Sequence, residues 1–407
     1  MTRATRLNSR LGAADAALLF APSSAGAPPS PITGSGTYDA SRFVYNWKAS
    51  QFTKTRSALA KARAGTGLCK IATIGNSITG GTGSGGAPNT TSYPAYARAM
   101  LATAGYPVGG TGWVCGDQNS FVDTRWTLAG GMGLFGSANA WQNFIAASTT
   151  ASATGTFVSD VAGTVLELGY LNNSSGPFTI TIDGATPSGG SVAVTGGASY
   201  SSGTVTPTTV ASTSGKITVT GLANTTHTLV FTSTSATVTY LCAAQVRGTT
   251  GTLFSNFGVP TSRTTPWMST ALFYQNGPLS RALDTFDLVI IEPMLINDCQ
   301  NGISAATSQA NLIDIAATYQ AAGSDVAFVM PGVPNPAGAI SAATWAAERQ
   351  AMYGAADAQN VPLVDIGDRL VSWATANTQG LMFDQYHFTA AGYADMALAV
   401  MSGLVLR

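Results

Sequence analysis

The sequence predicts an α/β fold, a doubly wound parallel sheet of five strands, interrupted by an inserted antiparallel β-sandwich or jelly roll. Short continuous apolar runs, typical of buried parallel strands, alternate with helical segments near the start and in the last third of the chain. Between these two parts lie short alternating strands separated by turn residues. The 407 residues, of which 45% are hydrophobic, suffice for more than one domain with a buried core.

The first α/β unit occupies residues 57–104. Residues 57–64 predict a helix, residues 70–74 a short buried strand that Gly75 ends, and residues 93–104 an alanine-rich helix. The preceding residues 1–45 predict a tail or linker. Its basic start, apolar run and small-residue segment resemble a secretory signal, and a disordered arm rich in Ala, Ser and Pro is the alternative.

Residues 129–245 predict the β-sandwich. Alternating runs at residues 178–182, 216–220 and 228–231 are typical of half-buried strands, and Asp183-Gly184 is a strong turn signal. Short strands at this spacing favour an antiparallel sandwich or jelly roll. Because the α/β pattern resumes afterwards, we interpret the region as an insertion into an α/β domain of residues 46–128 and 246–407.

The last third of the chain completes the α/β pattern. Its predicted strands are residues 252–257, 287–291, 326–330 and 361–366, and its predicted helices are residues 307–322, 342–358 and 389–404, the last with Thr389 as N-cap. Functional residues of such sheets lie beyond the carboxyl ends of the strands. We therefore expect the chemistry just after Ile74, Phe257 and Ile291, and in a late loop.

Charge and composition exclude several classes of protein. Only 9% of the residues are charged, and Lys+Arg equal Asp+Glu at 19 each, so neither a basic excess nor a basic stripe indicates a nucleic-acid partner. The chain has no run of 18 apolar residues, so the sequence predicts no membrane span. The four cysteines are Cys69, Cys115, Cys242 and Cys299. Because they form no CxxC pair and the chain has only two histidines, a zinc site is not expected. Whether the cysteines form disulfides or remain thiols is left open.

Ser77 lies directly after the first predicted strand, in the segment Gly-Asn-Ser-Ile-Thr-Gly-Gly of residues 75–81. A serine in this turn is presented at the carboxyl edge of the sheet, where helix N-terminal amides can stabilise negative charge. The alternative is an ordinary helix-capping serine.

Asp384 and His387 stand three residues apart in a loop before the last predicted helix. At this spacing the carboxylate can reach Nδ1 of the imidazole, which fixes the tautomer and leaves Nε2 free to face a nucleophile. The alternative is a histidine held locally in a capping loop. The other histidine, His227, falls in a turn between β runs, where we expect it to be exposed to solvent.

Asn297 follows the strand of residues 287–291, and its amide can donate to a developing oxyanion. Asn-Asp after a strand is also an ordinary turn.

Together these segments resemble the conserved blocks of the SGNH, or GDSL-like, hydrolase family. Residues 75–78 are similar to its Gly-Asp-Ser block, residues 295–298 to its Gly-x-Asn-Asp block, and residues 384–387 to its Asp-x-x-His block, in the family's order. The resemblance covers residues 65–128 and 246–407. It implies a flavodoxin-like sheet. Asn76 and Leu295 depart from the usual Asp and Gly of the blocks.

The resemblance further implies a serine esterase without metal or organic cofactor. Ser77 would be the nucleophile, His387 the base and Asp384 its partner. The oxyanion hole would combine the Ser77 amide, the Asn297 side chain and an amide of the second block. In that block Thr261 takes the register position of the family's glycine, and Gly258 is the alternative, with a tight turn as its other role.

For substrate, we expect an O-acetylated carbohydrate, because an inserted jelly-roll-like module of low charge resembles carbohydrate-binding domains. Trp126 and Trp141 flank its start and could stack on sugar rings, or pack in the core. The hypothesis is O-deacetylation of a polysaccharide, such as a bacterial surface glycan, by an extracellular or virion-associated enzyme of the phage-tail type, with homo-oligomer formation left open. The alternatives are a lipase or general carboxylesterase, and a non-catalytic glycan-binding virion protein.

Overall fold

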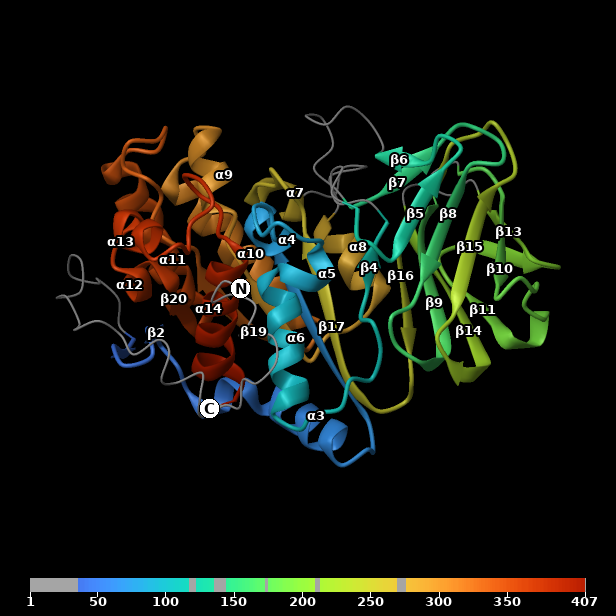
Figure 1. The fold of residues 1–407 in the computed structure, drawn as a ribbon, viewed down its shortest axis with the longest axis horizontal. Coiled ribbons are helices and arrows are strands. Elements are labelled where there is room, and N and C mark those ends of the chain that lie inside the picture. The colour runs from blue at the N-terminus through green and yellow to red at the C-terminus, as the bar shows by residue number, and fades with distance from the viewer. Residues whose placement is uncertain are drawn as a thin grey trace, which may run out of the picture.

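One large mixed sheet runs through the protein (Figure 1). The computed structural model describes residues 36–116, 122–134, 144–172, 175–208, 213–268 and 276–406. Within these residues the large sheet has 14 strands, and a second sheet has six. The expected tail falls largely outside the described residues, as does Trp141.

The α/β part of the large sheet has neighbouring parallel strands in the order β20-β19-β18-β3-β17. Their bounds are β3 Leu68–Gly75, β17 Gly251–Gly258, β18 Leu288–Ile291, β19 Asp325–Met330 and β20 Leu363–Asp365. The predicted α/β class with parallel strands is confirmed. In register, Gly75 pairs with Gly258 and Ile74 with Ile291, so the loops after β3, β17 and β18 meet at one edge.

Helices cover this sheet, and two pairs of them pack together: α6 with α14, in front of the strands in Figure 1, and α10 with α11. The N-caps of α10, α11 and α14 are Ser304, Ser341 and Thr389, each of which accepts a backbone N–H with its side chain. The helices are η1 Ala49–Phe52, α3 Thr53–Arg63, α4 Ser77–Gly80, α5 Pro88–Thr91, α6 Tyr93–Thr103, α7 Thr264–Met268, α8 Asn276–Leu283, α9 Leu295–Gln300, α10 Ala305–Ala321, α11 Ala342–Gln359, α12 Ile366–Leu370, α13 Trp373–Thr378, α14 Ala390–Val400 and η3 Met401–Val405.

The large sheet continues from β17 into the β region without a break. Beyond β17 the order is β4-β16-β9-β14-β11, and β17 pairs with β3 on one side and β4 on the other. The bounds are β4 Val114–Cys115, β9 Gly163–Asn172, β11 Val192–Val194, β14 Thr213–Thr225 and β16 Thr239–Arg247; β6 Gly133–Leu134 and β7 Ala146–Ser148 attach to β16, and β1 Tyr38–Asp39 and β2 Val44–Tyr45 lie beyond β20.

The second sheet has the order β12-β13-β10-β15-β8-β5 and is antiparallel. Its strands are β5 Trp126–Ala129, β8 Thr154–Val158, β10 Phe178–Ile182, β12 Ala198–Ser201, β13 Thr204–Pro207 and β15 Thr228–Ser233. Apolar side chains of both sheets form one buried core, in which Phe178 stacks on Phe231. The β region is thus two-layered, but one layer is an extension of the α/β sheet, which the sequence did not predict.

Candidate active site

Ser77 is the first residue of α4 and follows β3 through a single residue, Asn76. The Asn76 side chain caps the helix, since its Oδ1 accepts the Ile78 amide at 2.8 Å. Ser77 retains 9% exposure, so its hydroxyl is sheltered yet reachable. The sequence left open whether Ser77 is a nucleophile or a helix cap. Asn76 is the residue that caps α4, and the Ser77 hydroxyl does not cap it.

The Ser77 hydroxyl meets His387 across the edge of the sheet. Its Oγ lies 2.8 Å from Nε2 of the imidazole, and Oδ2 of Asp384 lies 2.7 Å from Nδ1. Asp384 Oδ1 also accepts the amides of Tyr386 and His387, both at 2.7 Å. The structure therefore brings the three predicted residues into one hydrogen-bonded line.

The electrostatics of this line favour an ionised Asp384. Partial burial acts to raise the pKa of its carboxyl, but the His387 amide, the imidazole and the Tyr386 amide together lower that pKa below its ordinary value. An ionised Asp384 accepts the Nδ1 proton, so Nε2 carries the lone pair that faces Ser77 Oγ. In this tautomer the imidazole can accept a proton from the hydroxyl.

His227 is buried, which corrects the expectation that it faces solvent. It is 2% exposed, and its Nδ1 lies 2.7 Å from Oδ2 of Asp183. Its Nε2 lies 3.0 Å and 2.9 Å from the carbonyl oxygens of Gly163 and Ala223. The reason is that the turn before β15 needs a donor for these carbonyls, which the imidazole supplies inside the β region.

The residues predicted to form the oxyanion hole lie at the carboxyl edge of the sheet, and they differ in their contacts and backbone conformation. Asn297 lies in α9, is 9% exposed, and donates from Nδ2 to Oε1 of Gln300 at 3.3 Å. Thr261 has a left-handed φ of 65°. The Gly258 amide donates to Oδ1 of Asn256 at 2.9 Å, and a Cβ at Gly258 would lie 2.2 Å from the Gly80 nitrogen. Close packing of β17 against α4 therefore accounts for Gly258, and this amide is already engaged.

The tryptophan expected to stack on sugars is instead a core residue. Trp126 is 4% exposed, packs on Phe157 with ring centroids 5.2 Å apart, and donates Nε1–H to the carbonyl of Val114 at 3.1 Å. It is therefore unavailable for stacking, because burial in the two-sheet core outweighs a surface role. Trp141, the other candidate, lies outside the described residues.

Two residues of the site were missed at the level of sequence. Phe383, next to Asp384, is 61% exposed, and its ring covers Gly83 of the loop after α4. Glu292, directly after β18, is fully buried and bonds the Asn76 amide. The one available signal for Glu292 was an acidic residue directly following a continuous apolar strand, where a buried carboxylate needs a special partner.

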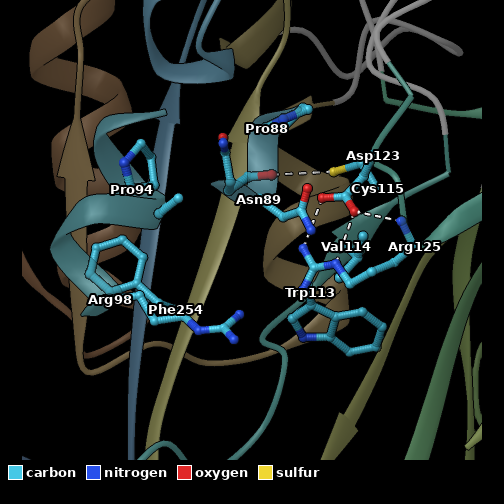
Figure 2. Close-up of a pocket in the computed structure, with 12 residues that line it drawn as sticks. Pro88, Asn89, Pro94, Arg98, Trp113, Val114, Cys115, Asp123, Arg125 and Phe254 are labelled. Atoms are coloured by element: carbon cyan, nitrogen blue, oxygen red, sulfur yellow. Dashed lines mark hydrogen bonds and ion pairs between the residues drawn. The ribbon is translucent and has the colours of Figure 1, made fainter. Parts of the chain in front are cut away.

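A small hollow of about 20 Å³ lies beside this edge, between α5, α6 and the strands β4 and β17 (Figure 2). A space of that size holds a water molecule rather than a sugar ring. Around it Arg125 makes two hydrogen bonds with Asp123, and Asp160 pairs with both Arg98 and Arg125. The Arg98–Asp160 pair joins α6 to the β region, which is its structural role.

Three further features bear on cofactors and setting. In the part of the chain that the structure describes, no group of three His, Cys, Asp or Glu side chains is arranged to hold a metal ion. All four cysteines are thiols, and burial raises the pKa of Cys69, Cys242 and Cys299. None of the described helices combines the length and apolar character needed to cross a membrane.

Comparison with known proteins adds to these observations. A serine in hydrogen-bonded line with a histidine and an aspartate is an arrangement that serine hydrolases of α/β fold use. Residues 224–394 match the GDSL-like Lipase/Acylhydrolase family. This part of the chain, less than half of its length, is similar to the GDSL-like (SGNH) acylhydrolases, which supports a carboxylic ester hydrolase. The matched span includes Asn297, Asp384 and His387; Ser77 lies outside it and joins them through the fold.

The fold is similar to that of a peptidoglycan O-acetylesterase, with a TM-score of 0.62, 15% sequence identity, and coverage of 88% of this chain and 96% of that one. An acetyl xylan esterase matches with a TM-score of 0.32 and 14% identity over 38% of this chain and 82% of its own. A family two carbohydrate esterase from Cellvibrio japonicus matches with a TM-score of 0.26 and 12% identity over 72% and 96%. No curated protein matches the sequence.

Proposed function

We propose that this protein is a serine esterase that removes O-acetyl groups from a polysaccharide. The observation that carries the proposal is the line of Asp384 Oδ2, His387 and Ser77 Oγ, with contacts of 2.7 Å and 2.8 Å. This is the arrangement that turns an unreactive hydroxyl into a nucleophile by giving its proton a place to go.

In the proposed reaction, Ser77 Oγ attacks the ester carbonyl while His387 Nε2 takes its proton. The tetrahedral intermediate collapses when the imidazolium protonates the sugar oxygen; the bond from the carbonyl carbon to that oxygen breaks, the sugar leaves as an alcohol, and the acetyl group stays on Ser77. Water then attacks the acetyl-serine while His387 takes its proton, and passing that proton to Ser77 Oγ breaks the acetyl–serine bond, which releases acetic acid and restores Ser77. The Ser77 amide and the Asn297 side chain are the proposed oxyanion donors.

Two observations support a carbohydrate ester. The fold is similar to that of a peptidoglycan O-acetylesterase over most of both chains. Phe383 is the most exposed of the large apolar side chains in the described residues, and it adjoins Asp384. An aromatic ring in that position suits the apolar face of a sugar. A surface glycan as substrate would place the enzyme outside the cell or on a virion.

The same Phe383 ring also favours one competing function, because it could contact a fatty acyl chain. A lipase or general carboxylesterase would use the same three residues and prefer longer acyl groups. The two functions differ in which side of the ester bond the exposed ring contacts.

The test measures acetate release from an acetylated polysaccharide and hydrolysis of p-nitrophenyl esters of increasing chain length. Ser77→Ala should lower kcat at least about 10,000-fold, while the exposed Ser57→Ala serves as control. Equal rates for wild type and Ser77→Ala would remove the esterase proposal. Phe383→Ala should raise KM for the polysaccharide several-fold and leave p-nitrophenyl acetate unaffected; a preference for long acyl chains in the wild type would favour the lipase.

A further inference from the structure

We propose that Glu292 is a positioning residue of this site, whose carboxylate holds the nucleophile turn and the start of α9 in a fixed relation. The inference rests on the proposed function, because its value lies in aligning the Ser77 amide with the Asn297 side chain. Glu292 touches neither Ser77 nor His387 and acts only through the backbone that it binds.

The contacts of Glu292 link two loops from different parts of the chain. Oε2 accepts the amide of Asn76, the residue before Ser77, at 3.0 Å, and the hydroxyl of Thr79 at 3.4 Å. Oε1 accepts the amide of Met294, the residue before α9, at 3.3 Å. One carboxylate therefore clamps the segments that carry both proposed oxyanion donors.

The surrounding backbone is shaped to admit this carboxylate. A Cβ at Gly75 would lie 2.6 Å from Glu292 Oε2 and 2.2 Å from Thr79 Oγ1, so only glycine fits there. Met294 adopts a left-handed φ of 60°, which a methionine rarely does. The glycine at position 75 and the strained backbone at Met294 are both consistent with a structure that requires the Glu292 contacts.

Glu292 is costly to keep, which argues against a purely structural role. It is fully buried, and among the described residues no Lys, Arg or His forms an ion pair with it. Burial raises its pKa to about 7, and the nearby Asp298 carboxylate adds to this, while the amides of Asn76 and Met294 and the Thr79 hydroxyl oppose it. The phenols of Tyr93 and Tyr393 are close enough for the Glu292 carboxylate to raise their pKa.

The sign of the stability effect follows from that shift. A carboxyl group whose pKa is higher in the folded than in the unfolded state contributes stability below its unfolded pKa, and this contribution is lost as pH rises through about 7. At pH 8 the ionised Glu292 therefore destabilises the fold. A neutral replacement removes the cost of this buried charge but also loses a hydrogen bond, so stability should change little while activity falls.

Glu292→Gln is the variant that separates the effect of Glu292 on activity from its effect on stability. Glutamine keeps one acceptor but turns an NH2 group toward one of the two amides, so either the Asn76 or the Met294 contact becomes donor against donor. The matched control is Glu348→Gln, since Glu348 in α11 is 1% exposed and burial likewise raises its pKa to about 7. Glu348 bonds neither Asn76 nor Met294 in the structure.

The experiment measures kcat, KM and melting temperature at pH 8 with p-nitrophenyl acetate, and hydrogen exchange of the peptide spanning residues 75–81. For Glu292→Gln we expect kcat to fall about 10- to 100-fold, KM to stay within about two-fold, the melting temperature to change little, and exchange at Asn76 to speed up. The acid side of the wild-type kcat profile should be steeper than that of the variant. Glu348→Gln should match wild type in kcat and exchange.

An unchanged kcat in Glu292→Gln, or equal losses in both variants, overturns the proposal. If wild type hydrolyses no ester, the proposed function fails, and the exchange at Asn76 still decides whether Glu292 fixes the turn. Should Glu292→Gln not fold, Glu292→Asp keeps the charge but is one methylene too short to reach both segments. Wild-type kcat and exchange in Glu292→Asp would then refute the role.

Discussion

The protein contains two histidine–aspartate pairs with nearly identical geometry and different surroundings. Nδ1 of His387 and of His227 each lies 2.7 Å from an aspartate Oδ2. At His387 the second nitrogen faces a hydroxyl, whereas at His227 it faces two carbonyl oxygens. A hydroxyl can donate to a neutral imidazole, but carbonyls can only accept. The group that Nε2 contacts, rather than the aspartate, therefore distinguishes the proposed base, His387, from the structural cation, His227.

The same contrast extends to the two regions of the molecule. The α/β edge exposes its imidazole, with 18% of the side chain accessible, whereas the β region buries its imidazole at 2%. Partners surround His227 on both sides, so proton transfer there has no route to a substrate.

The largest effect is expected from His387→Gln. Loss of the base should lower kcat by about 100,000-fold, because Ser77 then has no group to take its proton. The melting temperature should change little, since His387 is partly exposed. Steady-state kinetics with p-nitrophenyl acetate and thermal unfolding check both statements, and a loss of less than about 100-fold would mean that another group is the base.

Asp384→Asn should lower kcat by about 1,000-fold. The asparagine amide can donate toward Nδ1 and so favours the tautomer that has no lone pair at Nε2. The matched change Asp183→Asn in the other pair should leave kcat within about two-fold. Comparable kinetic losses in the two variants would contradict the assignment of roles.

His227→Gln should leave kcat unchanged below the unfolding transition but lower the free energy of unfolding by about 2 kcal/mol. The substitution leaves the carbonyls of Gly163 and Ala223 and the Asp183 carboxylate without the imidazole that joins them. Urea unfolding followed by circular dichroism measures the change. A variant as stable as wild type would show that water replaces the imidazole without cost.

The smallest effect is a divergence in pH dependence. Burial acts to lower the pKa of His227, but Asp183 and the carbonyls of Gly163 and Ala223 together raise it above the ordinary value. Its stabilising contribution is therefore full below the unfolded pKa and is lost as pH rises through the folded pKa. Melting temperatures of wild type and His227→Gln should converge as pH rises; a constant difference would refute this linkage.

Sequence reasoning predicted well the features that follow from local pattern. Ser77, Asp384 and His387 each lie in a segment whose place in the α/β order puts it at the carboxyl edge, and the chain offers few other histidines. The strands of the parallel sheet were readable because buried parallel strands are continuously apolar. These signals are contained within ten or so residues.

The features that could not be predicted depend on contacts between distant segments. Trp126 and His227 look like surface candidates until the large sheet covers the second sheet, to which Trp126 belongs and which His227 borders. Glu292 has no local partner, because its three hydrogen bonds come from Asn76, Thr79 and Met294 across two loops. The engaged amide of Gly258 likewise follows from its close contact with α4, which no spacing rule indicates.

The pairing of β17 on both sides has a consequence for engineering the protein. Deleting residues 129–245 would remove β16 but keep β4, and β4, beside β17, would then be an edge strand with unpaired N–H and C=O groups. A sheet edge exposed in this way templates pairing with other chains. A shortened chain of residues 46–128 joined to 246–407 should therefore aggregate through that edge, even though it would keep Ser77, Asp384 and His387.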